Sequence, residues 1–399
     1  MKRQILALVM ICCVTLHAAD WPQFRGVQGS GASAESSVPA TLNLTTTLDW
    51  QVNLPGQGLS SPVIVGDLVF VTASSGMRQQ TLHVICFRAS DGERVWERQF
   101  WATGRTMCHE KTSVAAPSPA TDGQHIVAIF SSSDIVCLDL KGNLIWFRGL
   151  GRDYPNASNS LGLSSSLVVA GGVVVAQVEN QSESFVAGLD LITGLNRWKL
   201  DRPRKPNWTS PVVIKQAGKE IVALQSSQGI TAIEPATGKT VWEHSGGASS
   251  VPSSTVGGSV LYVPAQGITA LQAGEGNEPP KQLWRSAQLR PGTPSPVLIG
   301  ERLFTLNDGG VLTCGNATNG ERLWQLRLKG PFSSTPVAAG RFIYCVNEKG
   351  VAQVVDSAKP EGEVVSELDL AETFLSTPAI AGGAIYLRGN TRLWKFGKS

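Results

Sequence analysis

The stretch LDLITGLNRW, Leu189–Trp198, contains the phrase that decides the fold. A short polar turn ends at Gly194, and Trp198 follows four positions later. The same pair at the same spacing returns as Gly92 and Trp96, Gly142 and Trp146, Gly238 and Trp242, and Gly320 and Trp324. Two degenerate copies contain Trp284 after an expanded turn, and Ser366 in place of the Trp. Recurrence at one offset indicates an internal structural repeat.

A second phrase stands upstream of each copy: a small hydroxyl residue, often before Pro, and then an apolar run. Eight copies of it begin at Ser60, Pro117, Ser164, Ser210, Ser253, Ser295, Ser334 and Ser376. The last five are about 40 to 44 residues apart. The segments between turns are short, rich in Val, Ile and Leu, and often alternating, which is typical of strands. Each copy therefore predicts one four-stranded antiparallel blade of a β-propeller.

The two ends of the chain predict how the ring closes. The eighth copy runs to Trp394 without an outer strand, whereas TLDWQVNL around Trp50 reads as an outer strand without inner ones. We therefore predict an all-β fold, an eight-bladed propeller over residues 48–399 that is closed by pairing of the N- and C-terminal strands. The repeat tryptophans are expected to lie on outer strands and to cover the seams between neighbouring sheets: Trp50, Trp96, Trp146, Trp198, Trp242, Trp284 and Trp324.

The composition excludes several classes of protein. Charged residues make up 16% of the chain and apolar residues 42%, which excludes a highly charged disordered protein. The formal net charge is only +3, so the chain has no global field to attract nucleic acid. We expect a monomer whose partners do not include nucleic acid.

The N-terminus is typical of a secretory signal peptide. Lys2 and Arg3 precede an apolar run that is too short to span a bilayer as a helix, and small residues follow it. We expect a signal peptide over residues 1–19 and an N-terminal extension over 20–47, with export to the periplasm or secretion. No small residue stands directly before Cys12, so a lipoprotein anchor is not expected.

The two phrases together resemble the PQQ-like β-propeller repeat, named for pyrroloquinoline quinone. LDLITGLNRW at Leu189–Trp198 and IEPATGKTVW at Ile233–Trp242 show the resemblance best, and it extends from about Leu48 to Phe396. The opening WPQFRG, Trp21–Gly26, resembles the mature start of exported bacterial members. The repeat is shared by quinoprotein alcohol dehydrogenases and by BamB-like outer-membrane assembly factors. The resemblance therefore implies a bacterial envelope protein.

The resemblance also implies what a dehydrogenase of this family requires: a PQQ pocket, Ca²⁺ held by oxygen ligands, a catalytic carboxylate and, in many members, a vicinal disulfide. The only adjacent cysteines here, Cys12 and Cys13, lie in the expected leader. We expect no cofactor, neither PQQ nor calcium. The five histidines lie apart, without metal-ligand spacing, and His83 is expected to be a core or edge histidine. No catalytic or metal-binding residue is assigned.

Departures from the repeat indicate candidate binding residues. Four polar insertions, Arg98–Pro119, Gly151–Gly162, Val178–Phe185 and Asp201–Ser210, belong to consecutive blades, whose corresponding loops share one rim. Amides beside aromatic rings suit sugar or peptide recognition, and cations can pair with a carboxylate. The candidates are His109, Lys111, Tyr154, Asn156, Asn159, Asn180, Arg202 and Trp208. Ordinary solvated loops are the alternative, because turns favour Asn and Ser.

These observations predict a non-catalytic exported propeller that serves as a binding or assembly scaffold in the bacterial envelope. By resemblance to BamB, its partners would be outer-membrane assembly components or extended segments of envelope proteins, for example by pairing with exposed blade edges. Two alternatives stay open. One is a PQQ-dependent quinoprotein oxidoreductase, and the other is a secreted propeller that binds carbohydrate or peptide.

Overall fold

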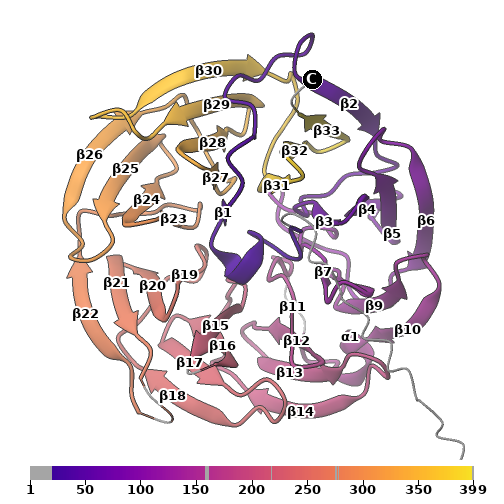
Figure 1. The fold of residues 1–399 in the computed structure, drawn as a ribbon. Coiled ribbons are helices and arrows are strands. Elements are labelled where there is room, and N and C mark those ends of the chain that lie inside the picture. Colours follow the sequence, from indigo (N-terminus) through magenta and orange to yellow (C-terminus); the bar gives the residue numbers. More distant parts are fainter. Residues whose placement is uncertain (1–19, 158–160, 217, 275, 277, 398–399) are drawn as a thin grey trace, which may run out of the picture.

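Eight sheets arranged around a central axis make up the computed structural model, which describes residues 20–157, 161–216, 218–274, 276 and 278–397 (Figure 1). Helix within these residues is limited to η1 (Val27–Gly29) and α1 (Leu150–Asp153). The predicted all-β, eight-bladed propeller is therefore confirmed. None of the helices in this described part has the length and apolarity that crossing a membrane requires.

The first four blades follow one another along the chain, each with its innermost strand first. Blade 1 contains β3 (Val63–Val65), β4 (Leu68–Ser75), β5 (Thr81–Arg88) and β6 (Arg94–Trp101). Blade 2 contains β7 (Ala120–Thr121), β8 (His125–Ile129), β9 (Asp134–Asp139) and β10 (Leu144–Gly149). Blade 3 contains β11 (Val168–Ala170), β12 (Val173–Val178), β13 (Phe185–Asp190) and β14 (Asn196–Asp201). Blade 4 contains β15 (Val212–Gln216), β16 (Lys219–Ser226), β17 (Gly229–Ile233) and β18 (Thr240–His244).

Blades 5 and 6 again use consecutive strands, whereas blades 7 and 8 each include a strand from the N-terminal part of the chain. Blade 5 contains β19 (Thr255–Gly257), β20 (Val260–Ala265), β21 (Gly267–Gln272) and β22 (Lys281–Ser286). Blade 6 contains β23 (Val297–Ile299), β24 (Arg302–Leu306), β25 (Val311–Asn316) and β26 (Arg322–Arg327). Blade 7 contains β27 (Val337–Ala339), β28 (Phe342–Val346), β29 (Val351–Asp356) and β30 (Glu363–Asp369), with β1 (Ala32–Ser33) added in parallel to β27. Blade 8 contains β31 (Ala379–Ala381), β32 (Ala384–Arg388), β33 (Arg392–Phe396) and β2 (Leu48–Asn53).

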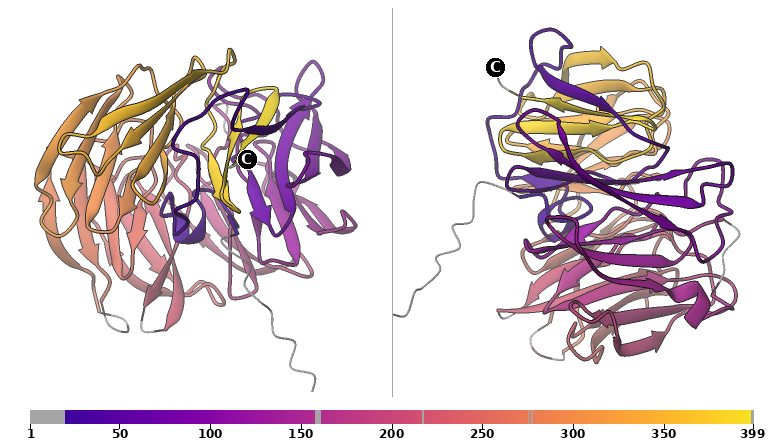
Figure 2. Two further views of the ribbon diagram at one scale, coloured as in Figure 1. Left: turned by 45° about the horizontal axis from the view of Figure 1, so that its top comes forward. Right: turned by 90° about the vertical axis from the view of Figure 1, so that its right-hand side faces the viewer.

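The ring closes in the predicted way. Strand β2, from the N-terminal part of the chain, is the outermost strand of blade 8 and pairs antiparallel with β33. The register places Gln51 opposite Trp394 and Asn53 opposite Arg392. The two ends of the chain therefore complete one sheet, which lies beside blades 1 and 7 (Figures 1 and 2).

The repeated Gly and Trp meet across the seams between blades. Trp198 lies on the outer strand of blade 3, and its Nε1 donates to the carbonyl of Pro235 in blade 4 at 2.8 Å. Its indole covers Gly238, where a Cβ would lie 2.6 Å from the ring and where φ is +71°. Only glycine accommodates both the close ring and the positive φ. The same indole-to-carbonyl bond joins Trp50 to Ala89, Trp96 to Leu140, Trp146 to Leu191, and Trp284 to Ala317.

The N-terminal extension fills the seam where the repeat has lost its tryptophan. Ser366 stands at the Trp position of blade 7, and its Oγ accepts the backbone N–H of Leu42 at 3.0 Å. Tyr344 of the same blade donates its hydroxyl to the carbonyl of Pro39 at 2.9 Å. Val38 and Leu42 are buried in the core cluster shared by blades 7, 8 and 1. The extension therefore supplies apolar side chains where the repeat no longer supplies an indole.

The repeated hydroxyl residue forms a belt of hydrogen bonds around the inner ends of the blades. In each link, a backbone N–H of one blade donates to the hydroxyl of the next blade; Ser166 N donates to Ser210 Oγ at 2.9 Å, for example. Seven such links connect, in order, Ser61, Ser118, Ser166, Ser210, Ser253, Ser295, Thr335 and Thr377. We call these eight residues the hydroxyl belt. The recurring hydroxyl of the sequence is therefore a bond between blades.

A buried arginine holds the one junction that the belt leaves open. The Oγ of Ser61 is buried without a described partner, so no belt bond joins blade 8 to blade 1. Arg388 of β32 crosses this junction and donates to the carbonyl of Thr72 at 2.8 Å and to the Oγ of Ser60 at 3.2 Å. Its side chain is fully buried, and this desolvation lowers its pKa to about 9. Arg388 thus supports the closure made by β2.

We expect Trp198→Ala to destabilise the fold strongly, because it removes a buried indole and its bond to Pro235. Large-to-small changes of this kind cost about 3–5 kcal/mol of unfolding free energy. Urea unfolding followed by fluorescence and circular dichroism measures the loss. Trp101→Ala is the matched control, because Trp101 is 67% exposed and its removal should change the unfolding free energy by less than about 0.5 kcal/mol. Equal losses for the two variants would contradict the role of the seam.

Candidate functional site

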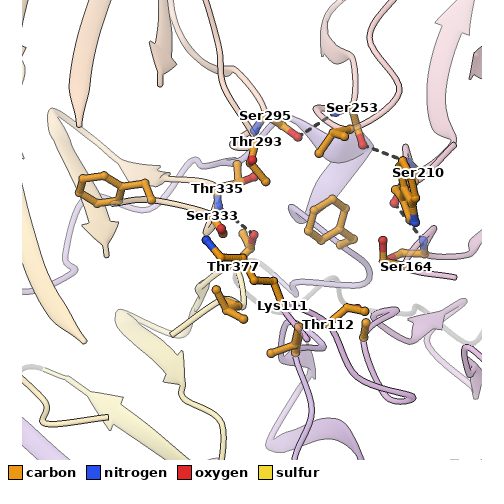
Figure 3. Close-up of a pocket in the computed structure, with 18 of the residues that line it drawn as sticks. Lys111, Thr112, Ser164, Ser210, Ser253, Thr293, Ser295, Ser333, Thr335 and Thr377 are labelled. Atoms are coloured by element: carbon orange, nitrogen blue, oxygen red, sulfur yellow. Dashed lines mark hydrogen bonds between the residues drawn. The ribbon is translucent and has the colours of Figure 1, made fainter. Parts of the chain in front are cut away.

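The inner ends of the blades surround a central cavity of about 620 Å³ (Figure 3). Seven of the eight residues of the hydroxyl belt line this cavity, and Ser61 is the one that does not. Apolar side chains lie among them in the wall, namely Leu59, Leu161, Val251, Phe332 and Leu375. Belt hydroxyls that accept a backbone N–H still have an O–H to donate toward a ligand. The wall is therefore largely uncharged, with hydrogen-bonding groups spaced around an apolar surface.

The N-terminal segment covers the cavity from one face of the ring. Asp20 accepts the N–H of Gly66 in the first turn of blade 1, and Glu35 accepts the N–H groups of Gly382 and Gly383 in the corresponding turn of blade 8. Between these anchors the chain crosses the axis of the ring, where η1 lies in Figure 1. Phe24 from this segment lines the cavity.

Arg25 anchors the crossing segment inside the ring. Its guanidinium donates to Thr255 Oγ1 at 2.8 Å, to the carbonyl of Pro296 at 3.4 Å and to the carbonyl of Ser254. The side chain is fully buried, and desolvation lowers its pKa to about 9. We call this crossing segment, residues 20–35, the plug. Because Thr255 and Pro296 belong to neighbouring blades, Arg25 joins the plug to two blades at once. The WPQFRG opening of the sequence is thus part of the fold.

Charged side chains gather at the opposite mouth of the cavity. Lys111 comes from the insertion between blades 1 and 2, and its Nζ bonds to both carboxylate oxygens of Glu348, at 3.1 and 3.0 Å. Glu348 lies in the turn between β28 and β29 of blade 7, and it also accepts the hydroxyl of Ser333 at 2.6 Å. Asp308 occupies the corresponding turn of blade 6 and accepts the N–H of Thr293 at 2.6 Å. The ion pair therefore bridges the mouth between blades far apart in the chain.

Three of the sequence-predicted residues line this cavity together. His109 and Lys111 come from one insertion and Trp208 from another. Trp208 donates its Nε1 to the carbonyl of Gly162 at 3.0 Å, which fixes the orientation of the indole. The Nδ1 of His109 accepts the N–H of Lys111 at 3.1 Å. Leu161 from a third insertion, Gly151–Gly162, also lines the cavity. The structure thus brings three of the four polar insertions to one place.

The other predicted residues lie elsewhere. The Tyr154 ring packs on Phe185 with centroids 4.6 Å apart, and Asn180 is buried and closes its own turn through Ser182 and Glu183. Asn156 is exposed, and Asn159 lies outside the described residues. Tyr154, Asn156 and Asn180 do not line the central cavity.

Arg202 is part of a buried ion pair. Its Nε bonds to Glu179 Oε1 at 2.6 Å, and the two side chains are 5% and 1% exposed. Asn207 donates to the other oxygen of Glu179 at 2.9 Å. Burial raises the pKa of Glu179 above its usual value, although Arg202 and Asn207 act in the opposite direction. A pair so enclosed belongs to the architecture of blades 3 and 4.

Sequence reasoning missed Phe24, Asp308, Glu348 and the belt as parts of one cavity. Two signals were present in the sequence. The hydroxyl residue recurs once in each blade, and Asp308 and Glu348 stand at matching positions of NDGG and NEKG in consecutive repeats. The first signal reflects the bonds between blades and the second the turn chemistry within each blade, so only the ring shows that both face one cavity.

The lining does not fit a calcium-bound quinone. Calcium takes six to eight oxygen ligands, in proteins largely from carboxylates and carbonyls. In the part of the chain that the structure describes, no three His, Cys, Asp or Glu side chains are grouped so as to hold a metal ion. The two carboxylates of the cavity bond to different partners: Asp308 accepts a backbone N–H, and Glu348 pairs with Lys111. The carboxylates of the cavity therefore do not by themselves form a calcium site in the described part of the chain.

Comparison with protein families gives one match. The PQQ_2 family, described as outer membrane protein assembly factor BamB, matches residues 40–201, 157–278 and 264–361. The three overlapping matches cover most of the chain and start in the N-terminal extension. No curated protein matches the sequence.

Solved structures share the fold at low sequence identity. BamB from Moraxella catarrhalis is similar with a TM-score of 0.64 and 16% identity, over 88% of this chain and 97% of that chain. A europium-containing methanol dehydrogenase has a TM-score of 0.66 and 13% identity, over 96% and 98% of the two chains. Quinohemoprotein alcohol dehydrogenase from Comamonas testosteroni has a TM-score of 0.56 and 13% identity, over 95% and 81%. At such identities the likeness shows the fold alone.

The ion pair of Arg202 and Glu179 gives a prediction with a defined pH dependence. Arg202→Met leaves Glu179 buried without its cation, which should lower the unfolding free energy by about 3–5 kcal/mol at pH 8. Because an acid with a raised folded-state pKa binds protons more tightly when folded, the loss should shrink as the pH falls from 8 to 5. Urea unfolding at pH 8 and at pH 5 measures this loss of unfolding free energy. Arg204→Met, in the same loop at an exposed position, should change little at either pH; a pH-independent loss for Arg202→Met would contradict the assignment.

Proposed function

We propose, from the premise that this chain belongs to the PQQ_2 family of outer membrane protein assembly factor BamB, that it is a binding propeller of the bacterial envelope. Its ligand would be an extended segment of an envelope protein that enters the central cavity. The family match supports a role in assembly, and the solved BamB structure shares the fold. Export through the N-terminal leader is part of the same proposal.

The single observation that supports this role best is the character of the cavity. Belt hydroxyls and apolar side chains alternate around it, while Lys111 and Glu348 satisfy each other. Such a wall can bond to the backbone of an entering peptide and cover its apolar side chains, whereas proton transfer needs an acid or base free to act. His109 and Asp308 are the other titratable groups of this lining, so the proposal rests on the predominance of hydroxyl and apolar groups in the wall.

The plug determines how a ligand enters. Phe24 and Arg25 occupy the ring from the face that holds the turns between the first and second strands of the blades. The mouth beside Lys111, on the opposite face, is therefore the entrance. A peptide would end in the cavity and would not thread through the ring. Trp208, held by its bond to Gly162, provides a fixed aromatic surface at this entrance.

A cavity-filling variant tests the proposal. Val251 lines the cavity and is 40% exposed, so Val251→Trp should fold and obstruct the site. The probe is a fluorescently labelled outer-membrane β-barrel protein, unfolded in urea and diluted, with binding followed by anisotropy. We expect the variant to bind at least about 10-fold more weakly, which corresponds to about 1.4 kcal/mol.

Leu323→Trp is the matched control, because Leu323 is 49% exposed on the outer strand of blade 6. It should bind the probe as the unmodified protein does. Equal binding by the two variants would place the ligand outside the cavity. No binding by the unmodified protein would reject the proposed ligand class, and a glycan array would then test the carbohydrate alternative.

The dehydrogenase alternative has its own measurement, a thermal unfolding titration with PQQ and Ca²⁺. A ligand at a hundred times its Kd stabilises the folded state by about 2.7 kcal/mol, which raises Tm visibly. Because the donor set of the cavity does not fit a calcium-bound quinone, we expect no shift. A saturable shift with a bound-quinone absorbance would favour the oxidoreductase instead.

A further inference from the structure

Three polar side chains of blade 1 form a hydrogen-bonded chain outside the central cavity. The Oγ of Ser75 lies 2.7 Å from Nε2 of His83, and Nδ1 of His83 lies 2.8 Å from Oε1 of Glu97. The residues come from the adjacent strands β4, β5 and β6. None of them lines the cavity, so the proposed binding role does not use them.

The carboxylate determines which nitrogen of His83 holds the proton in the neutral ring. Ionised Glu97 is only an acceptor, so Nδ1 must carry the hydrogen that faces it. Nε2 is then unprotonated and accepts the hydroxyl proton of Ser75. A serine that donates to a histidine oriented by a carboxylate is the arrangement of an activated nucleophile.

Further contacts hold Glu97 in this position. Its Oε1 also accepts Nε2 of Gln99 at 2.8 Å, and its Oε2 pairs with Arg94 at 2.5 Å. Desolvation alone would raise the pKa of Glu97, but the hydrogen bonds from Gln99 and His83, together with the charge of Arg94, bring the pKa below its usual value. Glu97 therefore stays ionised at neutral pH.

The strand register shows that the group opens toward solvent at one end. Thr81 is paired with both Ser75 and Trp101, so these side chains share a face of the sheet. His83 is 3% exposed, whereas Ser75 is partly exposed and Trp101 is 67% exposed. The base is therefore shielded from water, and the nucleophile lies at the rim, with Thr81 between it and the exposed Trp101 ring.

The turn after Ser75 supplies backbone donors. In the described part of the chain, the N–H groups of Gly76 and Met77 bond to no protein acceptor. The N–H of the residue after a nucleophilic serine commonly stabilises the oxyanion that forms on attack. Gly76 has a positive φ of +86°, which glycine adopts without strain.

We propose that Ser75, His83 and Glu97 are the nucleophile, general base and orienting carboxylate of an ester-hydrolysing site. Its substrate class is a carboxylic ester with an apolar group that lies against Trp101. This activity goes beyond the proposed binding function and does not depend on it.

The reaction needs only water as its second reactant. The Oγ of Ser75 bonds to the ester carbonyl carbon while its proton passes to Nε2 of His83. The ester C–O bond then breaks, and the departing alcohol takes that proton. A water molecule next gives a proton to Nε2, its oxygen bonds to the acyl carbon, and the acid leaves as Ser75 recovers its proton. Nothing is oxidised or reduced.

Covalent labelling of the purified full chain tests the site. A fluorophosphonate probe should phosphonylate Ser75, which mass spectrometry of the digested protein locates. The same preparation should hydrolyse p-nitrophenyl butyrate, and Ser75→Ala should lower kcat/KM by at least about 100-fold. Glu97→Gln should lower kcat while leaving KM nearly unchanged, because Glu97 does not touch the ester.

Ser90→Ala is the matched control, because Ser90 is an exposed serine of the same blade. It should keep the full rate and the label on Ser75. Trp101→Ala should raise KM for the butyrate ester more than for the acetate ester. Absence of phosphonylation at Ser75 in the unmodified protein, or hydrolysis that survives Ser75→Ala, would overturn the proposal. The labelling result does not depend on whether any variant folds, and neither result depends on the cavity.

Discussion

The seam between neighbouring blades is the contact on which the rest of this structure depends. Most blades place an indole on the outer strand, and that indole packs on the glycine turn of the next blade, as Trp198 packs on Gly238. The core clusters accordingly combine side chains of adjacent blades. A blade cannot bury its faces alone, so the free energy of folding is shared around the ring. Where the indole is missing, the extension takes its place at Leu42, and where the ring would open, β2 and Arg388 close it.

The same constraint sets the character of the cavity. The hydroxyl belt exists because blades are joined at their inner ends by side chains that accept a backbone N–H, and its members incidentally form an uncharged lining. Individual chemistry comes from what is added to the repeat. Lys111 and Trp208 come from insertions, and Phe24 and Arg25 come from the N-terminal segment. A common fold thus acquires a particular site through its loops and ends.

Blade 1 shows how a sheet can position reactive groups without a cavity. Cross-strand spacing brings Ser75, His83 and Glu97 onto one face, and the hydrogen bonds among them require only regular antiparallel register. The cavity and this group differ in one physical respect. In the cavity Lys111 and Glu348 satisfy each other, whereas on blade 1 Glu97 orients His83, which accepts the hydroxyl of Ser75 at the rim. The proposed binding and the proposed ester hydrolysis therefore rest on separate groups of residues.

The sequence by itself determined the blade, the number of blades and the closure, because these follow from local periodicity: strand lengths, a Gly–Trp spacing, and an unpaired outer strand around Trp50. Only the tertiary structure decided which polar residues meet. Lys111 and Glu348 are 237 positions apart and touch because the ring is closed. Arg202, predicted as a candidate binding residue, is buried with Glu179. His83, predicted to be a core or edge histidine, is buried and also bridges Ser75 and Glu97. Periodicity specifies where a strand lies, but contacts across blades and strands depend on the curvature of the ring and on register, which no local pattern contains.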